Sequence, residues 1–239
     1  MTRTLEILDR LVAFDTVSDR SNLSLIAYAQ DLLAAQGFDV SVLPDPEDDK
    51  AGLLARIGPP GQGVLPSAHS DVVPAEGLVW TRDPFRLTRD GPRVYGRGTT
   101  DMKGFLACAL AAAERAATLP LTQPLTLVIS YDEEVGCRGI ARMRDRLVPA
   151  LGTPRAAIVG EPTEMAVATG HKGKDVLRVD CHGTPGHSAL APRFVNALHI
   201  AADVVTALRS LQQQFAATGA QDPAYAIPYN TVHVGTLQG

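Results

Sequence analysis

LTLVISYDEEVGC, residues 125–137, joins an apolar, β-branched run directly to three acidic residues. Pro124 precedes the run, and Asp132, Glu133 and Glu134 follow it, so its length and composition are those of a short buried strand. A strand that is apolar on both faces is typical of a sheet covered by helices on each side. The acidic residues therefore stand where this strand ends, at one edge of the predicted sheet.

Helix and strand signals alternate on both sides of this strand. Apolar residues recur every three or four positions in residues 4–14 and 23–36, which predicts two amphipathic helices, and Gly37 stands where the second would be capped. Residues 103–117 predict an Ala-rich helix. Short strands are predicted over residues 38–43, 52–57, 64–68 and, as a further buried strand, 156–159. This order predicts an α/β sandwich with a largely parallel sheet.

The pattern changes near residue 173, and we expect a domain boundary there. Residues 174–182 and 229–236 alternate apolar and polar side chains, as half-exposed strands do, and a long helix is predicted between them over about 194–215. This order predicts a small α+β domain with an exposed sheet face. Residues 1–173 would form the first domain, and residues 174–239 the beginning of the second.

Composition and charge exclude several classes of protein. The 239 residues include 22 Lys and Arg against 26 Asp and Glu, a net charge of −4, so no basic surplus favours nucleic-acid binding. The N-terminal apolar stretch contains charged residues, and no run of eighteen apolar residues occurs, so we expect neither a signal peptide nor a membrane span. Three separated cysteines without CxxC spacing favour free thiols in a reducing compartment, which predicts a cytoplasmic protein.

Four clusters of polar residues follow strands or precede a helix in the first domain. They contain His69 with Asp71, Asp101 in a Gly-rich turn, Glu133 with Glu134, and Glu161. Because the carboxyl ends of parallel strands meet in one crevice, these side chains can lie close together. Neighbouring carboxylates repel one another unless a cation offsets their charge. A histidine among carboxylate oxygens suits Zn²⁺, Co²⁺ or Mn²⁺, and two such metals can activate water, which predicts a metal-dependent hydrolase.

Each cluster taken alone also has a simpler interpretation. A histidine at a strand end is more often a structural residue than a metal ligand, and Asp101 could be the N-cap of the following helix. Glu133 and Glu134 could be solvated at a loop, and Glu161 could cap a strand. Their recurrence at the ends of successive elements weakens these interpretations together, but excludes none of them individually.

The clusters lie in motifs that occur in a fixed order. These motifs are HSDVVP at 69–74, GRGTTDMKG at 96–104, SYDEEVGC at 130–137 and GEPT at 160–163. In this order they resemble the M20 metallopeptidase family of dinuclear zinc hydrolases. Together with HKGK at 171–174 and HSALAP at 187–192, they look most like its acetylornithine deacetylase branch. The resemblance implies a zinc-exopeptidase-like catalytic domain over residues 1–173 and the start of a lid or dimerisation domain over residues 174–239.

The resemblance also implies the metal ligands. His69 and Glu161 would bind one metal, Glu134 would bind the second, and Asp101 would bridge the two. The metals of the family are two Zn²⁺ ions, for which Co²⁺ is expected to substitute.

Three further residues match catalytic positions of the family. Asp71 matches the carboxylate that orients the histidine ligand, and Glu133 matches the general base that takes a proton from the water bridging the metals. His187 matches a lid histidine that stabilises the oxyanion and that the other subunit contributes in dimeric relatives. The implied reaction hydrolyses the amide of N²-acetyl-L-ornithine to L-ornithine and acetate, in arginine biosynthesis, by a homodimer formed through the lid.

Two alternatives remain open. Succinyl-diaminopimelate desuccinylases, aminoacylases and dipeptidases share the same metal cluster, and residues of the acyl pocket rather than metal ligands choose the substrate. The family pattern also includes a further histidine ligand after the lid, which no segment here matches, and His233 in an alternating strand is a poor substitute. We therefore expect a part of a longer chain, and the second alternative is a non-catalytic binding or dimerisation protein.

Overall fold

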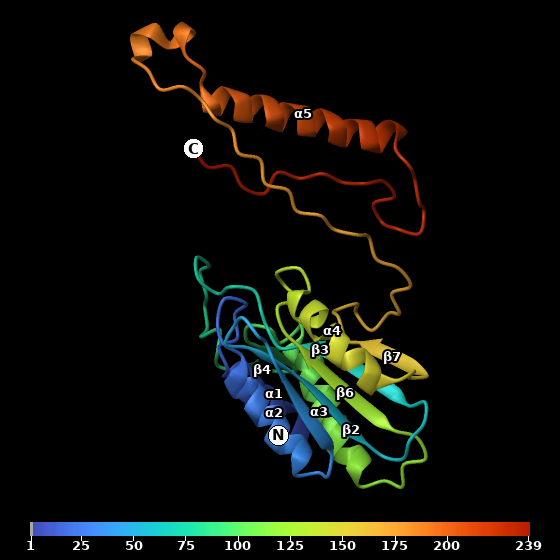
Figure 1. The fold of residues 1–239 in the computed structure, drawn as a ribbon. Helices are drawn as coiled ribbons and strands as arrows, with labels where there is room; N and C mark the ends of the chain where they lie inside the picture. The colour runs from blue at the N-terminus through green and yellow to red at the C-terminus, as the bar shows by residue number, and fades with distance from the viewer. Residues whose placement is uncertain (1) are drawn as a thin grey trace. The chain divides into compact units, whose positions relative to one another are not determined.

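The computed structural model describes residues 2–239 and places the predicted central strand, β6 (Leu125–Ser130), in the middle of a five-stranded sheet (Figure 1). The strand order is β1-β2-β6-β3-β7. The other bounds are β1 (Asp39–Pro44), β2 (Ala51–Ile57), β3 (Val64–His69) and β7 (Ala156–Val159). These strands confirm the predicted ones to within a few residues, and the α/β class is confirmed.

The sheet is mixed, not largely parallel as the sequence suggested. β2 pairs antiparallel with both β1 and β6, whereas β3 runs parallel to both β6 and β7. Only residues 45–50 join β1 to β2, and a parallel pair needs a crossover of a dozen residues or more. β7 was also expected to be buried, but it lies at the edge of the sheet, and all four of its residues are exposed.

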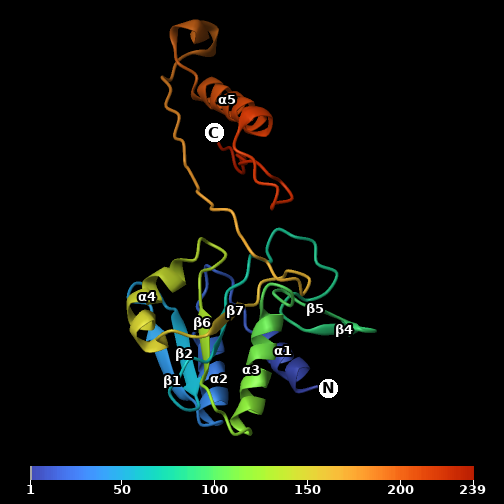
Figure 2. The same cartoon turned by 90° about the vertical axis from the view of Figure 1, so that its right-hand side faces the viewer.

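Three helices cover one face of the sheet (Figure 2). They are α1 (Arg3–Val12), α2 (Leu23–Ala34) and α3 (Lys103–Ala117), each within a few residues of its predicted range. Their buried side chains form the larger hydrophobic cluster with Leu127 and Ile129 of β6. No helix among residues 2–239 is long and apolar enough to cross a membrane.

The helix α4 (Arg138–Leu151) lies on the opposite face and was not predicted (Figure 2). Met143 and Leu147 are its largest buried side chains, and they pack in a second hydrophobic cluster with Val128 of β6. Four arginines and Pro149 lie within the helix, so its apolar spacing is difficult to recognise in the sequence. Successive residues of β6 therefore face different helical layers, which is why this strand is apolar throughout.

A small hairpin lies outside the main sheet, in the segment between β3 and α3. It consists of β4 (Thr88–Asp90) and β5 (Arg93–Tyr95), which pair antiparallel. The sequence did not predict these strands, because three residues are too few to show an alternating pattern.

Residues 170–239 form a separate unit, divided from the first between Thr169 and Gly170. It contains the 3₁₀ helix η1 (Ser188–Arg193) and the long helix α5 (Ala197–Thr218). The helix predicted over 194–215 is therefore present, but it begins at Ala197, because the side chain of Asn196 accepts a hydrogen bond from the amide of Leu198 at 2.8 Å and caps it. That this unit is a lid or dimerisation domain stays a prediction.

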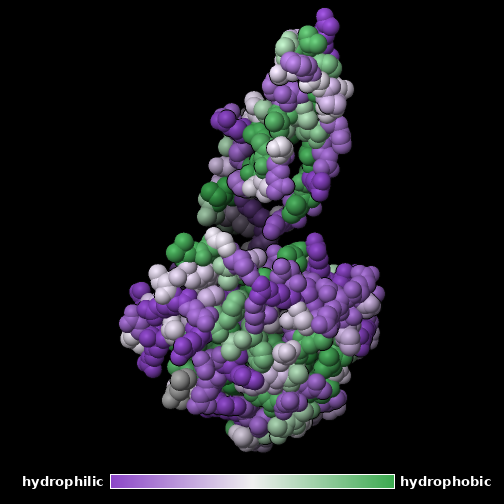
Figure 3. Space-filling model, turned by 90° about the vertical axis from the view of Figure 1, so that its left-hand side faces the viewer, coloured by the Kyte–Doolittle hydropathy of each residue, from purple (hydrophilic) through white to green (hydrophobic). Residues whose placement is uncertain are grey.

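The strands predicted over 174–182 and 229–236 are absent from the structure. No residue of the second unit is buried, and Leu177 is 88% exposed. The surface of this unit accordingly shows hydrophobic and hydrophilic residues side by side (Figure 3). A strand needs neighbouring strands to pair with, and the described residues provide none for these two segments, although the amide of Val232 donates to Oε1 of Gln212 in α5 at 2.7 Å.

Asp45, which follows β1, links the sheet to α4 through a buried carboxylate. Its Oδ2 accepts hydrogen bonds from the hydroxyl of Tyr131 at 2.7 Å and from the guanidinium of Arg142 at 2.6 Å. Burial by itself would raise the pKa of Asp45, but the bonds from Tyr131 and Arg142 outweigh it and lower the pKa to about 2.

Asp45→Asn should lower the free energy of unfolding near pH 7 by about 1–3 kcal/mol, because the buried hydroxyl of Tyr131 and the partly exposed guanidinium of Arg142 lose a charged acceptor. The folded-state pKa lies below the ordinary value of 3.8, so this contribution is complete above that value and disappears as the pH falls toward 2. Urea unfolding of both proteins at several pH values checks this prediction. A stability difference that stays constant down to pH 2 would contradict it.

Candidate metal centre

His69 ends β3 at the carboxyl edge of the sheet, and its side chain is only 1% exposed. It pairs in register with Ser130 of the neighbouring β6, so the residues after both strands emerge at the same edge. Its Nδ1 lies 2.9 Å from the backbone oxygen of Asp71 and 3.4 Å from Oδ1 of the same residue. This contact leaves Nε2 to face the acidic residues.

Three carboxylates surround Nε2 of His69. Oδ1 of Asp101 lies at 3.2 Å, Oε1 of Glu161 at 3.8 Å and Oε2 of Glu133 at 4.0 Å. Burial would lower the pKa of His69, but Asp71, Glu161 and Glu133 outweigh it and raise the pKa to about 9. Nε2 of His69 thus faces a group of carboxylate oxygens.

Asp71 connects His69 to the segments that surround it at this edge of the sheet. It is 3% exposed, and its Oδ2 accepts a hydrogen bond from the hydroxyl of Ser18 at 2.7 Å. Its two oxygens also accept the backbone N–H groups of Glu133 at 3.1 Å and Glu134 at 3.3 Å. Burial opposes ionisation, yet the bonds with His69 and Ser18 keep the pKa of Asp71 below its usual value. The predicted contact of Asp71 with His69 is present, and the bonds to the two glutamate amides add to it.

Glu133 and Glu134 belong to different groups of potential ligand atoms around His69. One group of potential ligand atoms comes from His69, Glu133 and Glu161, and a second from His69, Asp101 and Glu134. The atoms within each group lie within 4.8 Å of one another. All five residues predicted to bind metal or to act as base therefore meet at one place, although the division of roles between Glu133 and Glu134 stays a prediction.

The simpler interpretation of Asp101 does not hold. The N-cap of α3 is Met102, without a side-chain capping bond, and the carboxylate of Asp101 faces His69 instead. Glu161 reaches the site from the loop after β7, the strand parallel to β3.

The donor set fits a divalent cation. Burial, together with the neighbouring Asp101, raises the pKa of Glu134, and burial with Asp101 and Glu133 raises that of Glu161. Within residues 2–239, no lysine or arginine nitrogen lies within 4.0 Å of the carboxylates of this cluster. One imidazole nitrogen with several carboxylate oxygens is a set of ligands that Zn²⁺ and similar metals accept.

A cavity of about 310 Å³ adjoins the cluster, and Asp101 and Glu134 are among its lining residues. Val73, Arg97 and Thr99 also line it, so the wall beside the acidic residues combines apolar, cationic and hydroxyl groups. Its volume is at the lower end of the range for small-molecule sites, about 300–1,000 Å³.

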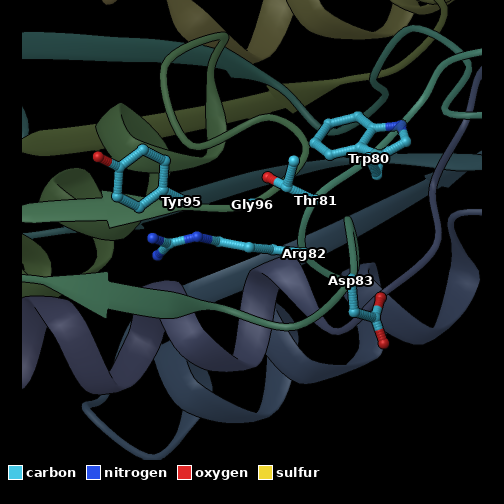
Figure 4. Close-up of a pocket in the computed structure, with 6 residues that line it drawn as sticks. All are labelled: Trp80, Thr81, Arg82, Asp83, Tyr95 and Gly96. Carbon is cyan, nitrogen blue, oxygen red and sulfur yellow. The ribbon is translucent and has the colours of Figure 1, made fainter.

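A second cavity, of about 230 Å³, is lined by the segment after β3 and by the hairpin strand β5 (Figure 4). The guanidinium of Arg82 lies 4.3 Å from the ring centroid of Tyr95, and that of Arg97 lies 4.8 Å from the ring of Trp80. None of the five clustered donors lines this cavity, so we assign it no part in metal binding.

His187 belongs to the second unit, where it precedes η1. Its Nδ1 accepts a hydrogen bond from the amide of Ala189 at 3.1 Å, the local contact expected of a loop histidine. Its predicted contact with an oxyanion is not tested by this arrangement and stays a prediction.

The sequence did not predict the residues that hydrogen-bond to Asp71 and to the turn that carries Glu133 and Glu134. Ser18 and Lys50 are buried, although each stands in a polar loop, and Asp132 was noted only as part of an acidic run. Asp132 could have been identified because it is adjacent to Glu133. No feature of the sequence indicated that Ser18 or Lys50 lies near the cluster.

Comparison with known proteins identifies the family. Residues 65–235 match the model of peptidase family M20/M25/M40. Acetylornithine deacetylase of Proteus mirabilis (strain HI4320) is 36% identical over 228 residues, which are 95% of this chain and 58% of the relative. Acetylornithine deacetylase of Pectobacterium carotovorum subsp. carotovorum (strain PC1) is 34% identical over 242 residues, 99% of this chain and 61% of the relative. The chain thus spans roughly three-fifths of the length of these curated relatives.

The fold is also similar to that of a solved M20 family metallo-carboxypeptidase, Sso-CP2 from Sulfolobus solfataricus. The TM-score is 0.59 and the identity 20%, over 67% of this chain and 37% of that one. The family model and the curated relatives confirm the family predicted from the ordered motifs. Since the family model covers most of the chain and the curated relatives match almost all of it, the chain belongs to peptidase family M20/M25/M40.

Proposed function

We propose that this chain carries the metal centre of an amidohydrolase that converts N²-acetyl-L-ornithine and water to L-ornithine and acetate. The convergence of His69 with four carboxylates at one sheet edge is the observation that carries the hydrolytic chemistry. The choice of substrate rests on the two relatives named acetylornithine deacetylase.

In this proposal His69 and Glu161 would hold one divalent metal and Glu134 a second, and Asp101 would be a ligand shared by both. The metals are Zn²⁺, with Co²⁺ as a functional substitute. When bound, such metals polarise the substrate carbonyl and lower the pKa of water from 15.7 to about 7. Asp71 keeps the imidazole of His69 oriented with Nε2 toward the carboxylates.

Glu133 is the proposed general base. The thiol of Cys137 lies 3.3 Å from its Oε1, and Oε2 faces the imidazole of His69, so Oε2 is the atom proposed to take the proton from the attacking water. Glu133 then gives this proton to the amide nitrogen as the carbon–nitrogen bond breaks. The second proton of the attacking water also passes to that nitrogen, so the products are acetate and ornithine with a protonated α-amino group. His187 is kept as the proposed hydrogen-bond donor to the developing oxyanion.

A homodimer formed through residues 174–239 and a cytoplasmic location complete the proposal. The exposed apolar side chains of Leu198 in α5 and of Phe194 and Val195 just before it support an association through this unit. Sedimentation equilibrium at micromolar concentration is expected to show dimers, and a monomer throughout that range would contradict this part.

The first prediction concerns the acyl group. The purified chain, supplied with Zn²⁺ or Co²⁺, should release amine from N-acetylornithine faster than from N-succinyl-diaminopimelate. Parallel assays of amine release check this directly. Preference for the succinylated compound would favour the desuccinylase alternative, and no release from either would contradict hydrolysis by this chain.

The second prediction concerns the base. Glu133→Gln should lower kcat by about 10²–10⁴-fold, because the amide cannot accept the proton, while the metal content stays unchanged. Steady-state kinetics and elemental analysis measure the two effects. Glu164→Gln, at an exposed glutamate three residues after Glu161, is the matched control and should change neither. Near-normal turnover of Glu133→Gln would overturn the assignment of the base.

The third prediction separates Glu134 from its neighbour. Glu134→Ala should lower the metal content by about one ion per chain, because it removes a ligand rather than a proton acceptor. Elemental analysis after exhaustive dialysis compares this variant with Glu164→Ala. An unchanged metal content would show that Glu134 is not a ligand.

A further inference from the structure

The turn that carries Glu133 and Glu134 starts from an unusual backbone conformation. Asp132 has a φ of 56°, in the left-handed region. For a non-glycine residue this region is sterically unfavourable, so surrounding contacts must hold it there. The carbonyl of Asp132 accepts the amide of Arg138 at 3.0 Å, and that of Glu133 accepts the amide of Gly136 at 2.9 Å. The direction in which both glutamates leave β6 is therefore set at Asp132.

The side chain of Asp132 is held by a buried lysine. Oδ1 of Asp132 accepts a hydrogen bond from Nζ of Lys50 at 2.7 Å, and the two side chains are 7% and 6% exposed. Nζ of Lys50 also donates to the backbone oxygen of Ser18 at 2.6 Å, and Oδ2 of Asp48 lies 3.4 Å away. The ammonium group thus connects the segment before β2, the segment before α2 and the turn after β6.

These contacts form a closed hydrogen-bond network that includes the backbone of the two glutamates. The hydroxyl of Ser18 donates to Asp71, and Asp71 accepts the amides of Glu133 and Glu134. The turn is consequently held on one side by Asp71 and on the other by Lys50, and Ser18 joins the two supports.

A buried ion pair gives little net stability, because desolvation of both charges offsets their attraction. An apolar pair of similar volume would fill the same space without that cost, but would not fix the angle at which Asp132 lies. The charged pair therefore contributes to the orientation of Asp132 rather than to the free energy of unfolding.

We propose that the Lys50–Asp132 ion pair is a positioning device that sets the backbone direction of Glu133 and Glu134, and through it the geometry of both groups of metal donors. Lys50 and Asp132 are positioning residues, because neither belongs to the donor groups themselves. The inference rests on the proposed function for its purpose, but its test does not depend on turnover.

Lys50→Met tests the pair, since it keeps most of the length of the side chain and removes the charge. Amide hydrogen exchange of the metal-free chain, followed by NMR, reports on the turn. We expect the amides of Glu133 and Glu134 to exchange about tenfold faster, or more, relative to those of Leu127 and Val128 in β6. Co²⁺ affinity, measured by absorption titration, should fall by about 10–100-fold.

Arg142→Met is the matched control. It removes the partner of another buried carboxylate, Asp45, which contacts Tyr131 beside the same turn. It should destabilise the fold without changing the relative exchange of the Glu133 and Glu134 amides. If the role of Lys50 were purely structural, the two variants would show the same relative exchange of the Glu133 and Glu134 amides.

Asp132→Asn and Lys50→Arg decide the question if Lys50→Met does not fold. Asp132→Asn should speed exchange at the same two amides, and Lys50→Arg, which keeps the charge, should retain most of their protection. Exchange at Glu133 and Glu134 that merely follows β6 in the folded variants would overturn the proposal. If the wild-type chain protects the backbone N–H groups of Glu133 and Glu134 but does not hydrolyse N-acetylornithine, only the proposed function is contradicted.

Discussion

The buried carboxylate of Asp71 joins three parts of the chain that lie far apart in the sequence. It accepts the hydroxyl of Ser18 and the amides of Glu133 and Glu134, and it faces Nδ1 of His69. Because the group is almost inaccessible to water, these donors replace the solvation that it loses on folding. The orientation of the imidazole and the course of the chain after β6 both depend on this residue, and both groups of metal donors depend on them.

The fold brings carboxylates of the same charge close together around His69, although they repel one another. Burial and neighbouring carboxylates raise the pKa values of Glu134 and Glu161, so this place disfavours their ionised forms. Strand ends and a helix start can impose such proximity because the sheet is packed by hydrophobic clusters on both faces. A divalent cation would remove the repulsion, so the arrangement that disfavours the empty site favours the occupied one.

Much of this site could be predicted, because its donors stand next to elements with clear patterns. His69 ends an apolar strand, and Glu133 and Glu134 follow another. The supporting residues could not be predicted, because Ser18 and Lys50 are buried only through contacts with segments 32 to 82 positions away. The strand predicted over 174–182 failed for a related reason: alternation describes a strand's faces, but pairing partners decide whether it forms.

Zinc-edge anomalous diffraction from crystals of the chain grown with Zn²⁺ would test the central claim most directly, namely that these side chains form a dinuclear centre. The account predicts two anomalous peaks about 3.5–4 Å apart, with one at bonding distance from Nε2 of His69 and both in contact with Asp101. A map without a peak at His69, or with zinc bound only elsewhere on the chain, would contradict it.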